Sequence, residues 1–197
     1  TTLAFPAAVS GLGYGQYTVT ETPAAAAKPG AWQIGATHHC SYAPPERSPE
    51  GLENDFVRVE LDTATGGIRS LRDKQTGTEV IASAPALEYA VERPNSMTAW
   101  AISHTGPVEH PTLVALRRNL TGPYKATIEV DLRIHESDFT LTYELRAGDP
   151  KLYVHLKGVW FQRGTAQTGI PMLRFAWPLA INEARARYEI PFGAIDR

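Results

Sequence analysis

Hydrophobic and polar residues alternate with a period of two along much of the chain. The clearest run extends from Ala126 to Ile134, and after the polar segment from His135 to Asp138 the alternation resumes from Phe139 to Leu145. A period of two predicts a strand that buries one face. Two such runs joined by a short polar turn predict a β-hairpin.

The same reasoning extends the β prediction to other parts of the chain. Gly148 and Pro150 favour a turn before a third strand that begins at Leu152. The remaining candidate strands are Val57 to Leu61, Ile68 to Leu71, Tyr14 to Thr20, Ala86 to Glu92, Thr98 to Ser103, Thr112 to Asn119, Leu173 to Trp177 and Ala186 to Ile190. No segment keeps a helical period for more than two turns. The pattern therefore predicts an all-β chain, a large antiparallel β-sandwich with little helix.

Three regions differ in character. Residues 1–21 contain one predicted strand, which we assign to a preceding small β region, and residues 22–51 are rich in proline and alanine, as expected of a linker or long loop. Residues 52–197 carry the regular alternation and form the predicted main sandwich. The chain starts with Thr1 and stops at Arg197 directly after a motif. We therefore expect a piece of a longer polypeptide, with the sandwich truncated at its C-terminus.

Charge and composition exclude some classes of partner. The 197 residues contain 19 Lys and Arg against 21 Asp and Glu, a net charge of −2, with both signs interspersed. Such a surface has no basic block for nucleic acid or anionic lipid. No apolar run approaches the roughly 20 residues that cross a bilayer. The single cysteine, Cys40, excludes an internal disulfide and favours a reducing, cytoplasmic location.

Three sets of polar residues deserve chemical interpretation. His38 and Cys40 are soft metal ligands, but zinc needs three or four ligands and no second pair has the right spacing, so the pattern favours a loop. The carboxylates Glu129, Asp131 and Glu144 lie on polar strand faces, where they would serve either as an acid/base pair or as cross-strand partners of Arg133 and Arg146. The second interpretation is the simpler one. His155, which shares its strand face with Tyr153 and Lys157, would suit a sugar epimerase if a carboxylate lay beside it.

The four tryptophans, Trp32, Trp100, Trp160 and Trp177, are candidates for a sugar-stacking platform. Trp160 and Trp177 flank apolar runs, which favours places in the core. The surroundings of Trp100 lack strong alternation, so its environment stays open.

Several phrases resemble, in order, the C-terminal region of the family 38 glycoside hydrolases, the α-mannosidases. They are Phe5–Tyr14, Leu52–Val59, Gly66–Lys74, Thr98–Ile102 and Tyr188–Arg197. The fourth phrase departs from the family, because Ala101 stands where an acid is usual. Together the phrases span almost the whole chain.

The resemblance implies a galactose-mutarotase-like sandwich that supports an N-terminal zinc-dependent catalytic domain and a helical bundle, both outside this chain. It implies no catalytic residue, cofactor or metal in this chain, zinc in the absent domain, and an α-mannoside or oligosaccharide as substrate. Trp100 and Arg197 are the candidates for the rim of the neighbouring sugar pocket. Two alternatives stay open: a stand-alone carbohydrate-binding module that uses Trp100 or Trp32, and a mutarotase-like epimerase that uses His155. An open sheet edge also predicts pairing with a second copy, a homo-oligomer.

Overall fold

The computed structural model describes residues 46–48, 51–95, 97, 101–103, 105–121, 124–182 and 185–196. In these residues every regular element is a strand. The strands are β1 Glu46–Ser48, β2 Gly51–Glu53, β3 Val57–Leu61, β4 Ile68–Asp73, β5 Ala86–Glu92, β6 Thr112–Thr121, β7 Lys125–Ile134, β8 Ser137–Arg146, β9 Leu152–Val159, β10 Ile170–Ala176, β11 Arg187–Ile190 and β12 Gly193–Asp196. The predicted all-β class is confirmed.

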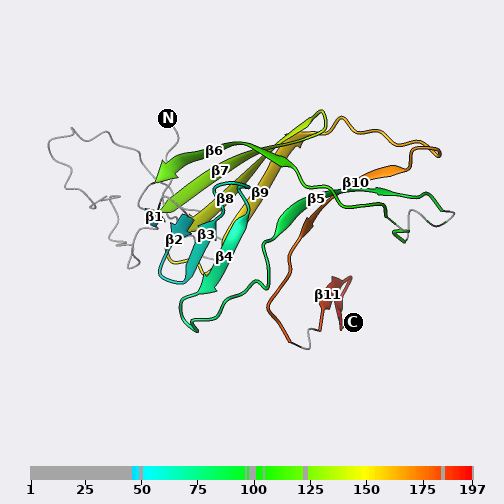
Figure 1. Cartoon of the computed structure of the whole chain (residues 1–197). Coiled ribbons are helices and arrows are strands. Elements are labelled where there is room, and N and C mark those ends of the chain that lie inside the picture. The colour runs from blue at the N-terminus through cyan, green and yellow to red at the C-terminus, as the bar shows by residue number, and fades with distance from the viewer. Residues whose placement is uncertain are drawn as a thin grey trace, which may run out of the picture.

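The largest sheet has the order β6-β7-β8-β9 (Figure 1). Its central hairpin, β7–β8, was predicted from the alternation, and the inward residues of both strands are buried. The turn is shorter than predicted, because Ser137 pairs with Ile134 and leaves only His135 and Glu136 between the strands. His135 has a φ of 49°, a left-handed backbone that is uncommon for a residue other than glycine.

A second sheet, β1-β2-β3-β4, packs across one face of the first (Figure 1). Its inward residues Val59 and Ile68 are almost fully buried with Val130 and Tyr143 of the large sheet. The Tyr143 hydroxyl donates a hydrogen bond of 3.3 Å to the carbonyl oxygen of Gly66. The main core therefore lies between these two sheets, as in a β-sandwich.

The other strands form two small sheets. β5 pairs with β10, and β11 pairs with β12. Leu87 and Tyr89 of β5 join the main core, whereas every residue of the β11–β12 hairpin is exposed. Figure 1 shows both small sheets beyond one end of the sandwich.

The predicted strand from Thr98 to Ser103 is wrong over residues 101–103, the part of it that the structure describes. Ala101, Ile102 and Ser103 lie outside any strand. The Ala101 N–H donates to the Met97 carbonyl oxygen at 2.9 Å, and the Ser103 N–H donates to the Glu92 carboxylate at 2.7 Å. These bonds take backbone donors that a strand would offer to a neighbour. The predicted strand at 14–20 lies outside the described residues, and so does most of the predicted linker, whose end contributes β1 and Gly51.

Candidate functional site

The polar face of the large sheet holds the carboxylates considered for acid/base chemistry. Arg117 of β6 lies between Glu129 and Asp131, with Nη2 3.4 Å from Glu129 Oε2 and 2.8 Å from Asp131 Oδ1. The Thr140 hydroxyl donates a further hydrogen bond of 2.8 Å to Asp131. Both carboxylates are therefore cross-strand partners of one arginine. The partner is Arg117 rather than Arg133, which pairs with Asp138 at 2.6 Å.

Glu144 belongs to a separate ion-pair group. Its carboxylate accepts from Arg146 Nε at 2.6 Å and lies 3.3 Å from Lys125 Nζ, while only 7% of its side chain is exposed. Burial raises the pKa of Glu144, but the hydrogen bonds and charges of Arg146 and Lys125 outweigh burial and leave that pKa below its ordinary value of 4.5. An ionised, doubly paired carboxylate is a poor general acid.

His155 lies on the exposed side of β9. It pairs in register with Thr142, which on its other side pairs with Glu129. Two strand spacings amount to about 10 Å, so His155 and Glu129 do not form a hydrogen-bonded pair along this row. The imidazole is instead stacked on Tyr153, with ring centroids 6.3 Å apart and planes at 8°. This placement does not favour the epimerase interpretation.

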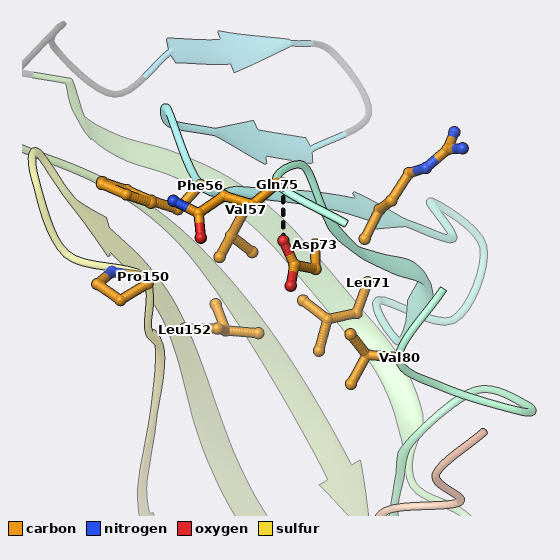
Figure 2. A pocket seen from close by; sticks show the side chains of 9 residues that line it. Phe56, Val57, Leu71, Asp73, Gln75, Val80, Pro150 and Leu152 are labelled. Atoms are coloured by element: carbon orange, nitrogen blue, oxygen red, sulfur yellow. Dashed lines mark hydrogen bonds between the residues drawn. The ribbon is translucent and has the colours of Figure 1, made fainter. Parts of the chain in front are cut away.

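A pocket of about 230 Å³ opens where β4 and the turn after it face the start of β9 (Figure 2). Most of its wall is apolar, and the lining residues are Phe56, Val57, Leu71, Arg72, Asp73, Gln75, Val80, Pro150 and Leu152. The Asp73 carboxylate accepts hydrogen bonds from the backbone N–H groups of Gln75, at 2.7 Å, and Thr76, at 3.3 Å. These bonds lower the pKa of Asp73. The only carboxylate of the pocket wall thus shapes a turn, and the pocket offers space without an evident catalytic group.

The segment Leu52–Val59, next to this pocket, stabilises the fold through the side chain of Asn54. Asn54 is 4% exposed, and its Nδ2 donates to the carbonyl oxygens of Arg146 and Asp149 at 2.8 and 2.9 Å. Its Oδ1 accepts from the N–H groups of Phe56 and Val57 at 2.9 and 2.8 Å. One side chain therefore fixes the turn between β2 and β3 in the second sheet and ties this turn to the β8–β9 connection.

Several predicted residues lie outside the described part of the chain. They are Trp100, Arg197, Trp32, His38 and Cys40. Asp196, the neighbour of Arg197, forms a bidentate pair with Arg187 at 2.6 and 3.0 Å. In the described ranges, no group of three or more His, Cys, Asp or Glu residues could hold a metal ion.

A cluster of aromatic and polar side chains lies beside the β7–β8 turn; the sequence named Trp160 as a sugar-stacking candidate but did not indicate which residues lie beside it. Tyr89 contacts the His135 ring edge-on, with centroids 4.9 Å apart, and its centroid lies 6.1 Å from that of Trp160. His135 Nε2 lies 3.4 Å from Glu109 Oε2. Trp160, expected in the core, is 38% exposed. We call these four residues the Trp160 cluster.

The fold places the chain among the all-β sandwich domains. The family described as "Glycosyl hydrolases family 38 C-terminal domain" matches residues 52–197. The chain therefore belongs to this family, which confirms the resemblance seen in its phrases. No curated protein matches the chain significantly. In the described residues, no helix is long and apolar enough to cross a membrane.

Proposed function

We propose that the chain is the non-catalytic C-terminal β-sandwich of a family 38 α-mannosidase, and that it supports an N-terminal zinc-dependent domain that hydrolyses α-mannosides. The observation that carries the proposal is the family match, which covers residues 52–197 and is specific to the C-terminal domain. A domain of this position in a glycosyl hydrolase implies an N-terminal partner. We also propose a cytoplasmic location, which the lone Cys40 favours.

The ion pairs of the large sheet support the proposal that glycoside hydrolysis takes place in the N-terminal domain. A retaining glycosidase uses two carboxyl groups about 5–5.5 Å apart, one of which must exchange a proton with the substrate. Glu129 and Asp131 share Arg117, and Glu144 is held by Arg146 and Lys125. Each of these three carboxylates is therefore already paired with a basic side chain.

The exposed apolar surface after β10 supports a covering partner. Trp177, Leu179 and Ile181 are 38%, 47% and 55% exposed. Large exposed apolar residues that gather on one segment are typical of an interaction surface. We propose that the catalytic domain or the helical bundle covers this segment.

The β11–β12 hairpin supports the same proposal. Tyr188 pairs with Ile195, and Ile190 lies two residues from Tyr188, so these three share one face. Arg187 and Asp196 form an ion pair on the other face. An isolated two-stranded hairpin is marginally stable in water, so a partner on its apolar face would stabilise it. Arg197 follows this hairpin, and we propose that Arg197 and Trp100 lie at the rim of the neighbouring sugar pocket.

The proposal is tested by comparing hydrolysis of an aryl α-mannoside by this chain with added zinc and by the polypeptide that also carries the N-terminal domain. We expect activity only from the longer polypeptide. Hydrolysis by the chain alone would overturn the proposal. In the longer polypeptide, Arg197→Ala and Trp100→Ala are each expected to lower kcat/KM, and an unchanged value would remove that residue from the rim.

Two other proposals concern assembly and binding. Pairing of two copies through a sheet edge predicts a dimer, which light scattering would detect. A carbohydrate-binding role is favoured by one specific observation, the Trp160 cluster.

A further inference from the structure

We propose that Tyr89, Glu109, His135 and Trp160 form a binding site for one hexose unit of a glycan. The choice of ligand rests on the proposed function, because a domain of a glycosyl hydrolase meets glycans. The site itself rests on geometry. Its residues come from β5, the segment before β6, the β7–β8 turn and the residue after β9, and the fold brings them together.

Trp160 provides the apolar part of the site. An alanine side chain at Gly158 would place Cβ 2.3 Å from Phe139 Cδ1, so the glycine lets the Phe139 ring lie against β9. The Phe139 ring then packs on Trp160, with centroids 6.2 Å apart, and Tyr89 supports the indole at 6.1 Å. Although these rings hold it in place, the tryptophan stays 38% exposed. A rigid, partly exposed indole suits the apolar face of a sugar ring.

Tyr89 links the indole to the polar groups of the site, because its ring lies beside both Trp160 and His135. Tyr89 is 6% exposed, and its hydroxyl forms no hydrogen bond with another described residue. Burial and the negative charge of Glu109 raise the pKa of Tyr89. The phenol therefore stays protonated and can donate. Glu109 and His135, with 53% and 42% of their side chains exposed, add an acceptor and a ring nitrogen. Sugar hydroxyls need this mixture of donors and acceptors.

The backbone at His135 supports a functional role for its side chain. Its φ of 49° lies in the left-handed region, which residues other than glycine seldom adopt, although asparagine, aspartate and histidine do so more often than the rest. Holding a residue other than glycine there costs of order 1 kcal/mol. The imidazole makes the edge-on contact with Tyr89 and approaches Glu109, both of which glycine would lose.

The test is a titration of the chain with methyl α-mannoside and with an α-linked mannobiose, followed by amide and indole NMR shifts. We expect shifts at Trp160 and His135. Trp160→Ala should weaken binding by about tenfold, the order expected for the loss of one aromatic stacking contact. The matched control is Trp177→Ala, because Trp177 is also 38% exposed and packs on one aromatic ring, Phe175, at 5.3 Å. This control should leave binding unchanged.

A second set of variants keeps the test valid if Trp160→Ala unfolds. His135→Asn preserves a residue that tolerates the left-handed backbone, and Glu109→Gln preserves shape; each should weaken binding several-fold without changing the urea midpoint by much. No shifts at high millimolar sugar, or equal weakening by the Trp177 control, would overturn the site. The hydrolysis experiment above does not depend on this titration, so failure of the site and failure of the proposed function are distinguishable. Loss of domain association in Trp160→Ala without any sugar-induced shift would assign the cluster to an interface and also overturn the proposal.

Discussion

Replacing Gly66 by alanine tests how closely the two sheets approach. Gly66 has a φ of 72°, and an added Cβ would lie 2.2 Å from Val130 Cγ1. Gly77 offers a matched control, because its φ is 71° but an added Cβ would meet no atom within 4 Å. The two substitutions share the backbone cost and differ in the steric clash.

The expected magnitudes follow from these two contributions. A left-handed backbone at alanine costs about 1–2 kcal/mol relative to glycine, and both variants carry this cost. Forcing an extra methyl group into a packed core typically adds about 1–3 kcal/mol. We therefore expect Gly66→Ala to lower the free energy of unfolding by about 2–5 kcal/mol, and Gly77→Ala by about 1–2 kcal/mol.

The assay is urea unfolding followed by tryptophan fluorescence, with the slope m compared between variants to check that the unfolded state is unchanged. Val130→Ala in the Gly66→Ala background should recover part of the loss, because it removes the clashing methyl groups. The close approach of Gly66 to Val130 is refuted if Gly66→Ala and Gly77→Ala change the free energy of unfolding by amounts that differ by less than about 0.5 kcal/mol. It is also refuted if Val130→Ala destabilises the Gly66→Ala variant as much as it destabilises the unchanged chain.

Two further predictions concern buried polar groups. Asn54→Ala should lower the free energy of unfolding by about 3–5 kcal/mol, because four hydrogen bonds are lost and two carbonyl groups lose a donor. Asn182 is exposed, so Asn182→Ala should change the midpoint of urea unfolding very little. Equal effects of the two substitutions would contradict the role of Asn54. Because the folded-state pKa of Glu144 lies below 4.5, its ion pairs stabilise the fold above that pH, and this contribution is lost as the pH falls through the folded pKa. Glu144→Gln should therefore reduce the fall in the free energy of unfolding as the pH is lowered. Urea unfolding at several pH values below neutrality measures this fall. Identical pH profiles for the variant and the unchanged chain would be inconsistent with this explanation.

Alternation predicted the strands that bury one face. The β7–β8 hairpin was placed almost to the residue, since Ile128, Val130 and Leu141 are nearly inaccessible while their neighbours are polar. The exposed hairpin β11–β12 was only half predicted, because each of its strands has four residues and buries neither face, so alternation gives little signal for either. β2 has three residues, too few for a period of two to be recognised.

The polar sites were harder to predict, because they depend on register. The sequence indicated that the sheet carboxylates would pair with arginines, but Arg117 reaches Asp131 only because β6 lies beside β7. The Trp160 cluster joins residues from four segments, and no local spacing connects them. Tryptophan beside an apolar run predicts a core position, whereas this indole lies where the main sandwich ends.

Reconstitution tests whether this domain assists chemistry that another domain carries out. The chain and the separately produced N-terminal region of the same polypeptide would be assayed with an aryl α-mannoside and zinc, alone and mixed. We expect no hydrolysis by the chain, little by the N-terminal region, and a clear rise in activity when the two are combined. Hydrolysis by the chain alone, or a mixture no more active than the N-terminal region, would contradict the account.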